Sequence, residues 1–269
     1  MNDKTKSKKI GIIGSGVMGE AFTAGLLKSG FCAAGDLTVS DESAARLEHM
    51  RKKHGVKATG DNNEVAESSE ILLLAVKPDA ISELLKEIAP NIREHMIVIS
   101  IAAGVKLASL TWYAKAKVVR AMPNICTQAG EGMTALSHTP NLSEDDLAMV
   151  QKFFESTGKT IWVDESKMDA VTAISGSGPA YIYLVMEAMT QGGVEAGLPL
   201  AQAKELVRQT FRGASALLEL GGTPAELREK ITSPNGTTAA ALHRLESHGV
   251  RGAFLDAISA AVQRSRDLG

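Results

Sequence analysis

The sequence predicts an α/β protein whose N-terminal half is a doubly wound, mostly parallel sheet and whose C-terminal half is entirely helical. Three observations lead to this fold class. Apolar runs typical of strands alternate with helical segments up to about residue 164, no convincing strand follows, and a glycine-rich turn joins the first strand to the first helix. Strands that alternate with helices form βαβ units, which close as a right-handed, mostly parallel sheet with helices on both faces.

The N-terminal half, residues 1–163, carries the elements of this sheet. Its first apolar run, IGII, stops at glycines as a buried parallel strand does, and the helix after it ends at Gly30, where a left-handed residue commonly closes a helix. Helices are expected at residues 17–30, 42–55, 78–90 and 141–158. Further strands are expected at residues 36–41, 70–76, 96–102, 117–123 and 159–165.

The C-terminal half, residues 164–269, shows helical spacing throughout. Helices are expected at residues 179–197, 200–220, 224–231, 237–249 and 251–268. Several are apolar over a wide arc, so they must be buried, and roughly 100 residues make a thin core alone. One face of the last helix holds Phe254, Ala257, Ile258, Ala261 and Val262. We therefore expect an all-α domain that packs against its copy in a homo-oligomer.

Composition narrows the class of partner. Of the 269 residues, 44% are hydrophobic and 22% charged, and the net charge is −2 with scattered Lys and Arg, so we expect a soluble protein that binds no nucleic acid. The two cysteines, Cys32 and Cys126, form no disulfide framework and suit a reducing cytosol. The apolar run after the basic N-terminus is too short for a signal peptide or a membrane span. We expect a cytoplasmic protein with a small-molecule task, and we predict no metal site.

The glycine-rich turn predicts a Rossmann-type dinucleotide-binding domain. GSGVMG follows a strand and opens a helix inside a βαβ unit, which is the context that this motif requires. Gly14 permits the tight turn, Gly16 lets the backbone approach a pyrophosphate, and Gly19 lets the helix pack close to the strand. The cofactor-binding residues of this turn are expected to be Gly14, Ser15, Gly16, Val17, Met18 and Gly19.

The end of the second strand favours NADH over NADPH by a small margin. Asp41 lies where an acid could bond the adenosine ribose, and a 2′-phosphate there would meet a like charge at a cost on the order of 4 kcal/mol at about 4 Å. The alternative is that Ser40 ends the strand, Asp41 turns outward, and Arg46 reaches the phosphate. The sequence is consistent with both orientations of Asp41.

Other strand ends should line the same edge of the sheet, where ligands of open α/β folds bind. AVKPDA is either part of this edge or only a strand-to-helix corner with Pro78 as the first helical residue. The further cofactor contacts expected at this edge are Ala75, Val76, Lys77, Pro78, Ala102, Met122, Pro123 and Asn124.

Two small-residue loops in the C-terminal half start helices without any charged side chain. SGSGPAY contains Ser175 and Gly176, which we expect to contact the cofactor, although close helix packing through glycine would also explain them. The second loop, SPNGTT, exposes backbone N–H groups that together with the helix dipole could hold an anion. An ordinary threonine N-cap at Thr237 or Thr238 is the simpler explanation of that loop.

The chain resembles pyrroline-5-carboxylate reductases nearly from end to end. The resemblance rests on IGIIGSGVMG, LLAVKP, VISIAAGV, VVRAMPN, DAVTAISGSGPAY, SPNGTTAAALHRLE and GVRGAFLDAI. It implies a helical domain that dimerises by interlocking, and a possible ring of dimers, a decamer. It also implies hydride transfer from NAD(P)H to the imine carbon of 1-pyrroline-5-carboxylate, which gives L-proline in the last step of proline biosynthesis.

The resemblance assigns roles to individual residues. Ser233 and the backbone N–H groups of Gly236 and Thr237 would hold the substrate carboxylate, and Thr238 would hydrogen-bond the ring nitrogen as the one catalytic side chain. Asn62 would lie near the adenosine ribose.

The chain departs from the family pattern at two places. MPNIC replaces the usual MPNTP, so Ile125 and Cys126 stand beside the pocket, and Gly221 stands where some relatives carry a glutamate.

Two alternatives to a reductase of this family remain at the level of sequence. A β-hydroxyacid dehydrogenase shares the GxxMG fingerprint, but the helix after SGSGPAY lacks the lysine that such an enzyme needs. A non-catalytic dinucleotide sensor on the same scaffold would accommodate the departures at Ile125 and Gly221.

Overall fold

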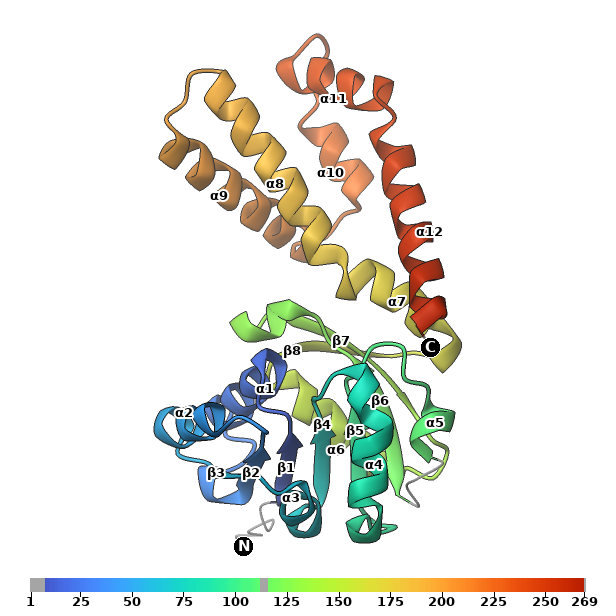
Figure 1. Ribbon diagram of the computed structural model, residues 1–269. Helices are drawn as coiled ribbons and strands as arrows, with labels where there is room; N and C mark the ends of the chain where they lie inside the picture. The colour runs from blue at the N-terminus through green and yellow to red at the C-terminus, as the bar shows by residue number, and fades with distance from the viewer. Residues whose placement is uncertain (1–7, 112–115, 269) are drawn as a thin grey trace, which may run out of the picture. The chain divides into compact units, whose positions relative to one another are not determined.

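The computed structural model describes residues 8–111 and 116–268. The chain forms two compact units, of which the first comprises Met1–Ser177 with Ala261–Gly269 and the second comprises Gly178–Ala260. The first is an α/β unit and the second is helical (Figure 1). The fold class predicted from the sequence is therefore confirmed.

The first unit is built on an eight-stranded sheet with the order β3-β2-β1-β4-β5-β6-β7-β8. All neighbouring pairs are parallel except β6 with β7, so the last two strands run opposite to the other six. The strands are β1 (Ile10–Ile13), β2 (Leu37–Ser40), β3 (Lys57–Thr59), β4 (Ile71–Leu74), β5 (Ile97–Ser100), β6 (Lys117–Met122), β7 (Gly132–His138) and β8 (Gly158–Trp162).

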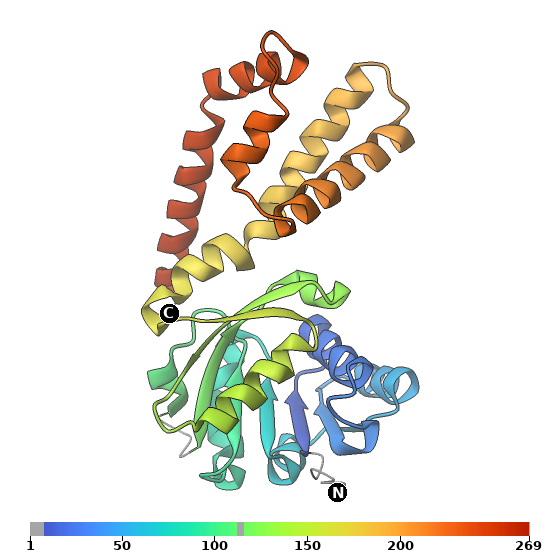
Figure 2. The same ribbon diagram turned by 180° about the vertical axis from the view of Figure 1, so that it is seen from behind.

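Helices cover both faces of this sheet (Figures 1 and 2). The α-helices of the unit are α1 (Val17–Lys28), α2 (Ala44–His54), α3 (Asn62–Ser68), α4 (Ile81–Ile88), α5 (Leu107–Thr111), α6 (Glu144–Glu155) and α7 (Met168–Val171). Strand residues alternate between two apolar cores, because successive side chains point to opposite faces. Ile10 and Ile12 pack with Phe22 on one face, whereas Ile13 packs with Leu84 on the other.

Two strands, β3 and β7, were missed by the sequence analysis. β3 has three residues at the edge of the sheet, and none of them is buried. β7 buries two small hydroxyl side chains, Thr134 and Ser137, next to Ala135 and Leu136, so it shows neither strict alternation nor a continuous apolar run. Such a pattern gives no clear strand signal.

The second unit has almost no core of its own. It contains α8 (Gly178–Glu195), α9 (Leu200–Glu219), α10 (Pro224–Lys230), α11 (Thr237–Ser247) and the first part of α12 (Val250–Leu268). Ala203 and Val207 are the only buried hydrophobic residues of this unit, while large apolar side chains such as Leu184 and Leu255 are 66% and 63% exposed. No helix in the described parts of the chain is sufficiently long and apolar to cross a membrane.

Candidate functional site

The glycine-rich turn between β1 and α1 uses each of its glycines for a different purpose. Gly14 has a φ of 95°, and a side chain there would meet the carbonyl oxygen of Ala75 at 2.7 Å. A Cβ on Gly19 would collide with the carbonyl oxygen of Gly14, so Gly19 lets α1 pack onto the turn. Gly16 instead faces open space and is the N-cap of α1, without a capping side chain. This geometry fits a pyrophosphate at the start of α1.

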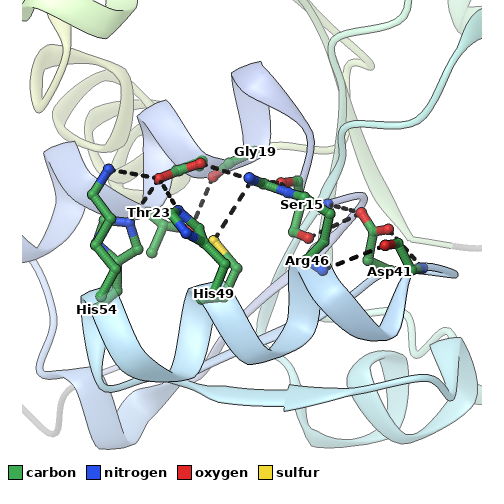
Figure 3. Close-up of polar contacts among 11 residues, drawn as sticks. Ser15, Gly19, Thr23, Asp41, Arg46, His49 and His54 are labelled. Carbon is green, nitrogen blue, oxygen red and sulfur yellow. Dashed lines mark hydrogen bonds and ion pairs between the residues drawn. The ribbon is translucent and has the colours of Figure 1, made fainter.

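Asp41 fastens the turn to the end of β2. Its Oδ2 accepts hydrogen bonds from the backbone N–H and the hydroxyl of Ser15 at 2.8 and 2.9 Å, and its Oδ1 accepts from the N–H of Ser43 at 3.0 Å (Figure 3). The carboxylate is therefore turned toward the turn and not outward. Arg46 donates from Nε to the carbonyl oxygen of Ser15 at 2.9 Å and from Nη2 to Glu20 at 2.7 Å.

Asn62 lies beside the end of β2. It is the first residue of α3, and its Oδ1 accepts a hydrogen bond from the buried hydroxyl of Ser40 at 2.8 Å. Its Nδ2 donates to Glu87 at 3.2 Å. The structure thus brings Ser40 and Asn62 together, although 22 positions separate them.

The segment after β4 makes a corner. Ala75 donates its N–H to the carbonyl oxygen of Ile13 at 2.8 Å, which keeps it beside the glycine turn. Pro78 is the first residue of a short 3₁₀ turn, and Lys77 and Pro78 are exposed, while Val76 is half-buried. Ala102, after β5, is buried. The corner geometry is present, and a cofactor contact of these residues remains a prediction.

Asn124 organises the end of β6. Its Oδ1 accepts from the N–H groups of Cys126 and Met133 at 3.2 and 3.3 Å, and its Nδ2 donates to the hydroxyl of Ser175 at 3.3 Å. Ser175 lies in a π-helical turn, Thr172–Gly176, which is a distortion frequent at functional sites.

Gly176 of the same turn lies against the end of β6. A Cβ on Gly176 would approach the terminal methyl of Met122 to 2.6 Å. Met122 and Asn124 therefore contact Gly176 and Ser175, which are distant from them in sequence.

In the second unit, α11 begins without a side-chain cap. The N-cap is Gly236, so the threonine N-cap considered from the sequence is wrong, and no side chain in the described residues takes its place. Asn235 adopts a positive φ of 56°, and the chain turns so tightly that a Cβ on Gly236 would collide with the hydroxyl of Ser233. The N–H of Gly236 already donates to the carbonyl oxygen of Ser233 at 3.0 Å. The donors offered by the helix start are thus those after Gly236.

Two groups of charged residues were missed by the sequence analysis. Arg120, only 6% exposed, pairs with Glu165 at 3.1 Å, and the same carboxylate oxygen accepts the N–H of Leu107 at 2.6 Å. The second group surrounds Glu20 and is formed by His49, Lys53 and His54 together with Arg46. No sequence motif joins these residues, because only the packing of α1 on α2 brings them together.

Burial and hydrogen bonding act in opposite directions on Glu20. Burial alone would raise the pKa of Glu20, but the hydrogen bonds from the basic side chains around it outweigh this and hold the pKa well below its usual range. Glu20 therefore carries its charge at neutral pH.

Comparisons with known proteins find matches to both halves of the chain. A family model described as pyrroline-5-carboxylate reductase dimerisation matches residues 165–268, and one described as NADP oxidoreductase, coenzyme F420-dependent, matches residues 9–104. A pyrroline-5-carboxylate reductase of Synechocystis sp. is 42% identical, over 98% of this chain and 99% of its own length.

Two solved structures of pyrroline carboxylate reductases are similar to this chain over nearly its whole length. A pyrroline-5-carboxylate reductase from Coxiella burnetii has a TM-score of 0.92 and 33% identity, over 98% of this chain and 99% of its own. The Plasmodium falciparum pyrroline carboxylate reductase, solved with NADP bound, has a TM-score of 0.89 and 31% identity, with the same coverage of 98% and 99%.

These findings decide between the alternatives left open by the sequence. The matches extend over nearly the whole chain, and the relatives given above are all named as reductases of pyrroline carboxylates. The match of the helical half to a dimerisation domain supports a homo-oligomer. The chain therefore belongs to the pyrroline-5-carboxylate reductase family of NAD(P)-dependent oxidoreductases.

Proposed function

We propose that the chain reduces 1-pyrroline-5-carboxylate to L-proline and that the uncapped start of α11 holds the substrate carboxylate. The observation that carries this assignment is a helix N-terminus closed by Gly236 without a capping side chain and flanked by the hydroxyl of Ser233. Hydrogen bonds to a charged group contribute roughly 1.5 to 3 kcal/mol each, so Ser233 and the N–H of Thr237 can replace a cationic side chain. Because its own N–H is used within the loop, Gly236 contributes the tight turn that brings Ser233 over the helix start.

The reaction requires few functional groups from the protein. Reduced nicotinamide supplies the hydride when it is bound, and a protonated cyclic imine is already electrophilic. The residues of this chain therefore bind, align and exclude water, and positioning supplies much of the acceleration. Thr238, the second residue of α11, is proposed to hydrogen-bond the ring nitrogen and to favour its protonated form.

The proposed dinucleotide contacts all belong to the first compact unit. The backbone of the GSGVMG turn binds the pyrophosphate, and Ser40 and Asn62 lie near the adenosine ribose. Asn124 holds the hydroxyl of Ser175, and both are proposed to contact the nicotinamide end. The segments 75–78 and 122–123, with Ala102 and Gly176, complete the proposed lining.

The proposed cofactor preference is for NADH. The carboxylate of Asp41 stays beside the turn because both of its oxygens are hydrogen-bonded, so it would repel a 2′-phosphate. The guanidinium of Arg46, the natural phosphate partner, is already bonded to Ser15 and Glu20. The Plasmodium falciparum relative was solved with NADP bound, so parallel kinetics with NADH and NADPH are the test of this proposal.

The finer description of the assembly is also a proposal. We place the functional boundary between the domains at residues 163 and 164, since the dimerisation model starts at residue 165, although the compact units separate after Ser177. The proposed assembly is a homodimer or a ring of dimers, and the proposed compartment is the cytoplasm, in keeping with two free cysteines.

Steady-state kinetics with pyrroline-5-carboxylate test the substrate assignment. Ser233→Ala is expected to raise the KM for the substrate at least tenfold, and Thr238→Val to lower kcat/KM at least tenfold, since each removes one hydrogen bond to a charged substrate. The KM for NADH should stay within threefold of wild type in both variants. Ser247→Ala, which removes a hydroxyl bonded within the other end of α11, is the matched control. Near-normal kinetics of both site variants would rule out the assignment.

A further inference from the structure

A cluster of charged side chains lies between α1 and α2, apart from the proposed contacts of the dinucleotide. Glu20 of α1 stands at its centre, bonded to side chains of α2 that include Arg46, His49 and His54, which are labelled in Figure 3. The basic residues around Glu20 all come from α2, and they are Arg46, His49, Lys53 and His54.

The two imidazoles converge on one oxygen atom. The Nε2 atoms of His49 and His54 lie 2.8 and 3.3 Å from Oε1 of Glu20. One ligand atom from each of the three residues lies within 4.8 Å of the other two. This arrangement depends on the end of α2, where His54 is the last helical residue and Gly55 turns left-handed with a φ of 67°.

We propose that Glu20, His49 and His54 form a binding site for Zn²⁺. Two imidazole nitrogens and one carboxylate oxygen are a ligand set that Zn²⁺ accepts, with water in the fourth position. The side chains of Glu20 and His54 are 18% and 9% exposed, whereas that of His49 is 41% exposed, so the site is closed on one side and open to water on the other.

Arg46 orients the carboxylate for this role. Its Nη2 donates to Oε2 of Glu20 at 2.7 Å, so this oxygen is occupied and Oε1 is left to face the two imidazoles. A hydrogen-bonded partner behind a ligand fixes the orientation of that ligand. Arg46 also bonds the carbonyl oxygen of Ser15, which places the proposed site next to the glycine-rich turn.

Lys53 is the group that competes with the metal. Its Nζ lies 2.9 Å from the same Oε1 and would repel a divalent cation. The lysine side chain is 57% exposed, so it can swing into solvent when Zn²⁺ binds. Removal of this lysine should therefore strengthen Zn²⁺ binding. If the cluster served only to hold α1 against α2, the same change would remove one of its ion pairs and would not increase the affinity for Zn²⁺.

Calorimetric titration of the full-length, tag-free protein with ZnCl₂ tests the proposal. Wild type is expected to bind one Zn²⁺ per chain with a micromolar Kd. His49→Ala and His54→Ala should each weaken binding at least tenfold, and Lys53→Met should tighten it at least threefold. His95→Ala, which removes an exposed histidine of the same unit, is the matched control and should bind as wild type does.

Thermal unfolding gives a second readout that does not depend on activity. Because a ligand that binds only the folded state stabilises it, the Tm of wild type should rise with ZnCl₂ and return with EDTA, and His49→Ala should show no such rise. Since His49 is partly exposed, this variant keeps the test interpretable even if His54→Ala does not fold. Zinc binding that is unchanged by both histidine substitutions, or absent from wild type, would overturn the proposal.

Discussion

Asp41 is the residue on which cofactor choice depends most directly. Its carboxylate has two consequences at once, since it fixes Ser15 in the glycine turn and places a negative charge beside the ribose position. Only the negative charge should matter for the choice between NADH and NADPH. An asparagine keeps a carbonyl oxygen for the N–H of Ser15 but removes the charge.

Asp41→Asn is therefore expected to raise kcat/KM for NADPH at least tenfold while that for NADH changes less than threefold. The physical reason is the removal of a repulsion on the order of 4 kcal/mol at about 4 Å before screening by solvent. Parallel assays with both cofactors measure the change, and Glu42→Gln, at the neighbouring exposed carboxylate, should leave the ratio unaltered. An unchanged ratio in Asp41→Asn would show that the carboxylate does not set the preference.

Gly221 lies in a turn that favours glycine. Its φ is 107° and that of Gly222 is 95°, so two successive residues adopt a conformation that L side chains rarely take. A glutamate at position 221 would strain this turn as it stands.

At the scale of elements, Glu20 joins α1 to α2. The hydrogen bonds from α2 lower the pKa of Glu20 in the folded state, so its contribution to stability is present above the unfolded pKa of about 4.5 and is lost as the pH falls further toward the folded value. Glu20→Gln should therefore cost on the order of 1 kcal/mol of unfolding free energy at pH 7.

Urea unfolding at pH 7 and below pH 4 measures this difference, which should shrink in acid. Glu48→Gln is the matched control, because Glu48 is 52% exposed and pairs only with Arg51 and Lys52 of its own helix in the described salt bridges. A deficit of Glu20→Gln that is equal at both pH values would contradict the linkage.

The elements that the sequence predicted well are those with a strong apolar period. The buried parallel strands β1, β4 and β5 and the long helices were expected within a few residues of their observed ends. β3, β7 and the short helices α3, α5 and α7 were missed, because few residues or buried hydroxyl side chains leave no readable pattern.

In the candidate site, too, the features with a local sequence pattern could be predicted and the others could not. The positions of the glycine turn and of the start of α11 could be predicted because each depends on residue types at fixed places in a short stretch of sequence. The Glu20 cluster and the pair of Arg120 with Glu165 could not, since both depend on tertiary packing.

At the scale of the whole molecule, the helical unit requires a partner surface. Its large apolar side chains are exposed and its own core is very small, so association of copies should bury them. Light scattering of wild type at micromolar concentration should give at least the mass of a dimer.

Leu255→Glu places a charge in this apolar surface and should shift the mass toward the monomer, while NADH binding by the first unit is retained. Ala24→Glu, on an exposed position of α1, is the control and should not change the mass. A compact wild-type monomer would contradict the account of the helical unit.

The central claim is that the N–H of Thr237 and the hydroxyl of Ser233, without any cationic side chain, hold the substrate carboxylate. A crystal structure with bound L-proline tests it most directly. The account predicts the proline carboxylate within hydrogen-bonding distance of the N–H of Thr237 and the hydroxyl of Ser233. A carboxylate bound by an arginine or lysine side chain, or anchored away from residues 233–238, would contradict it.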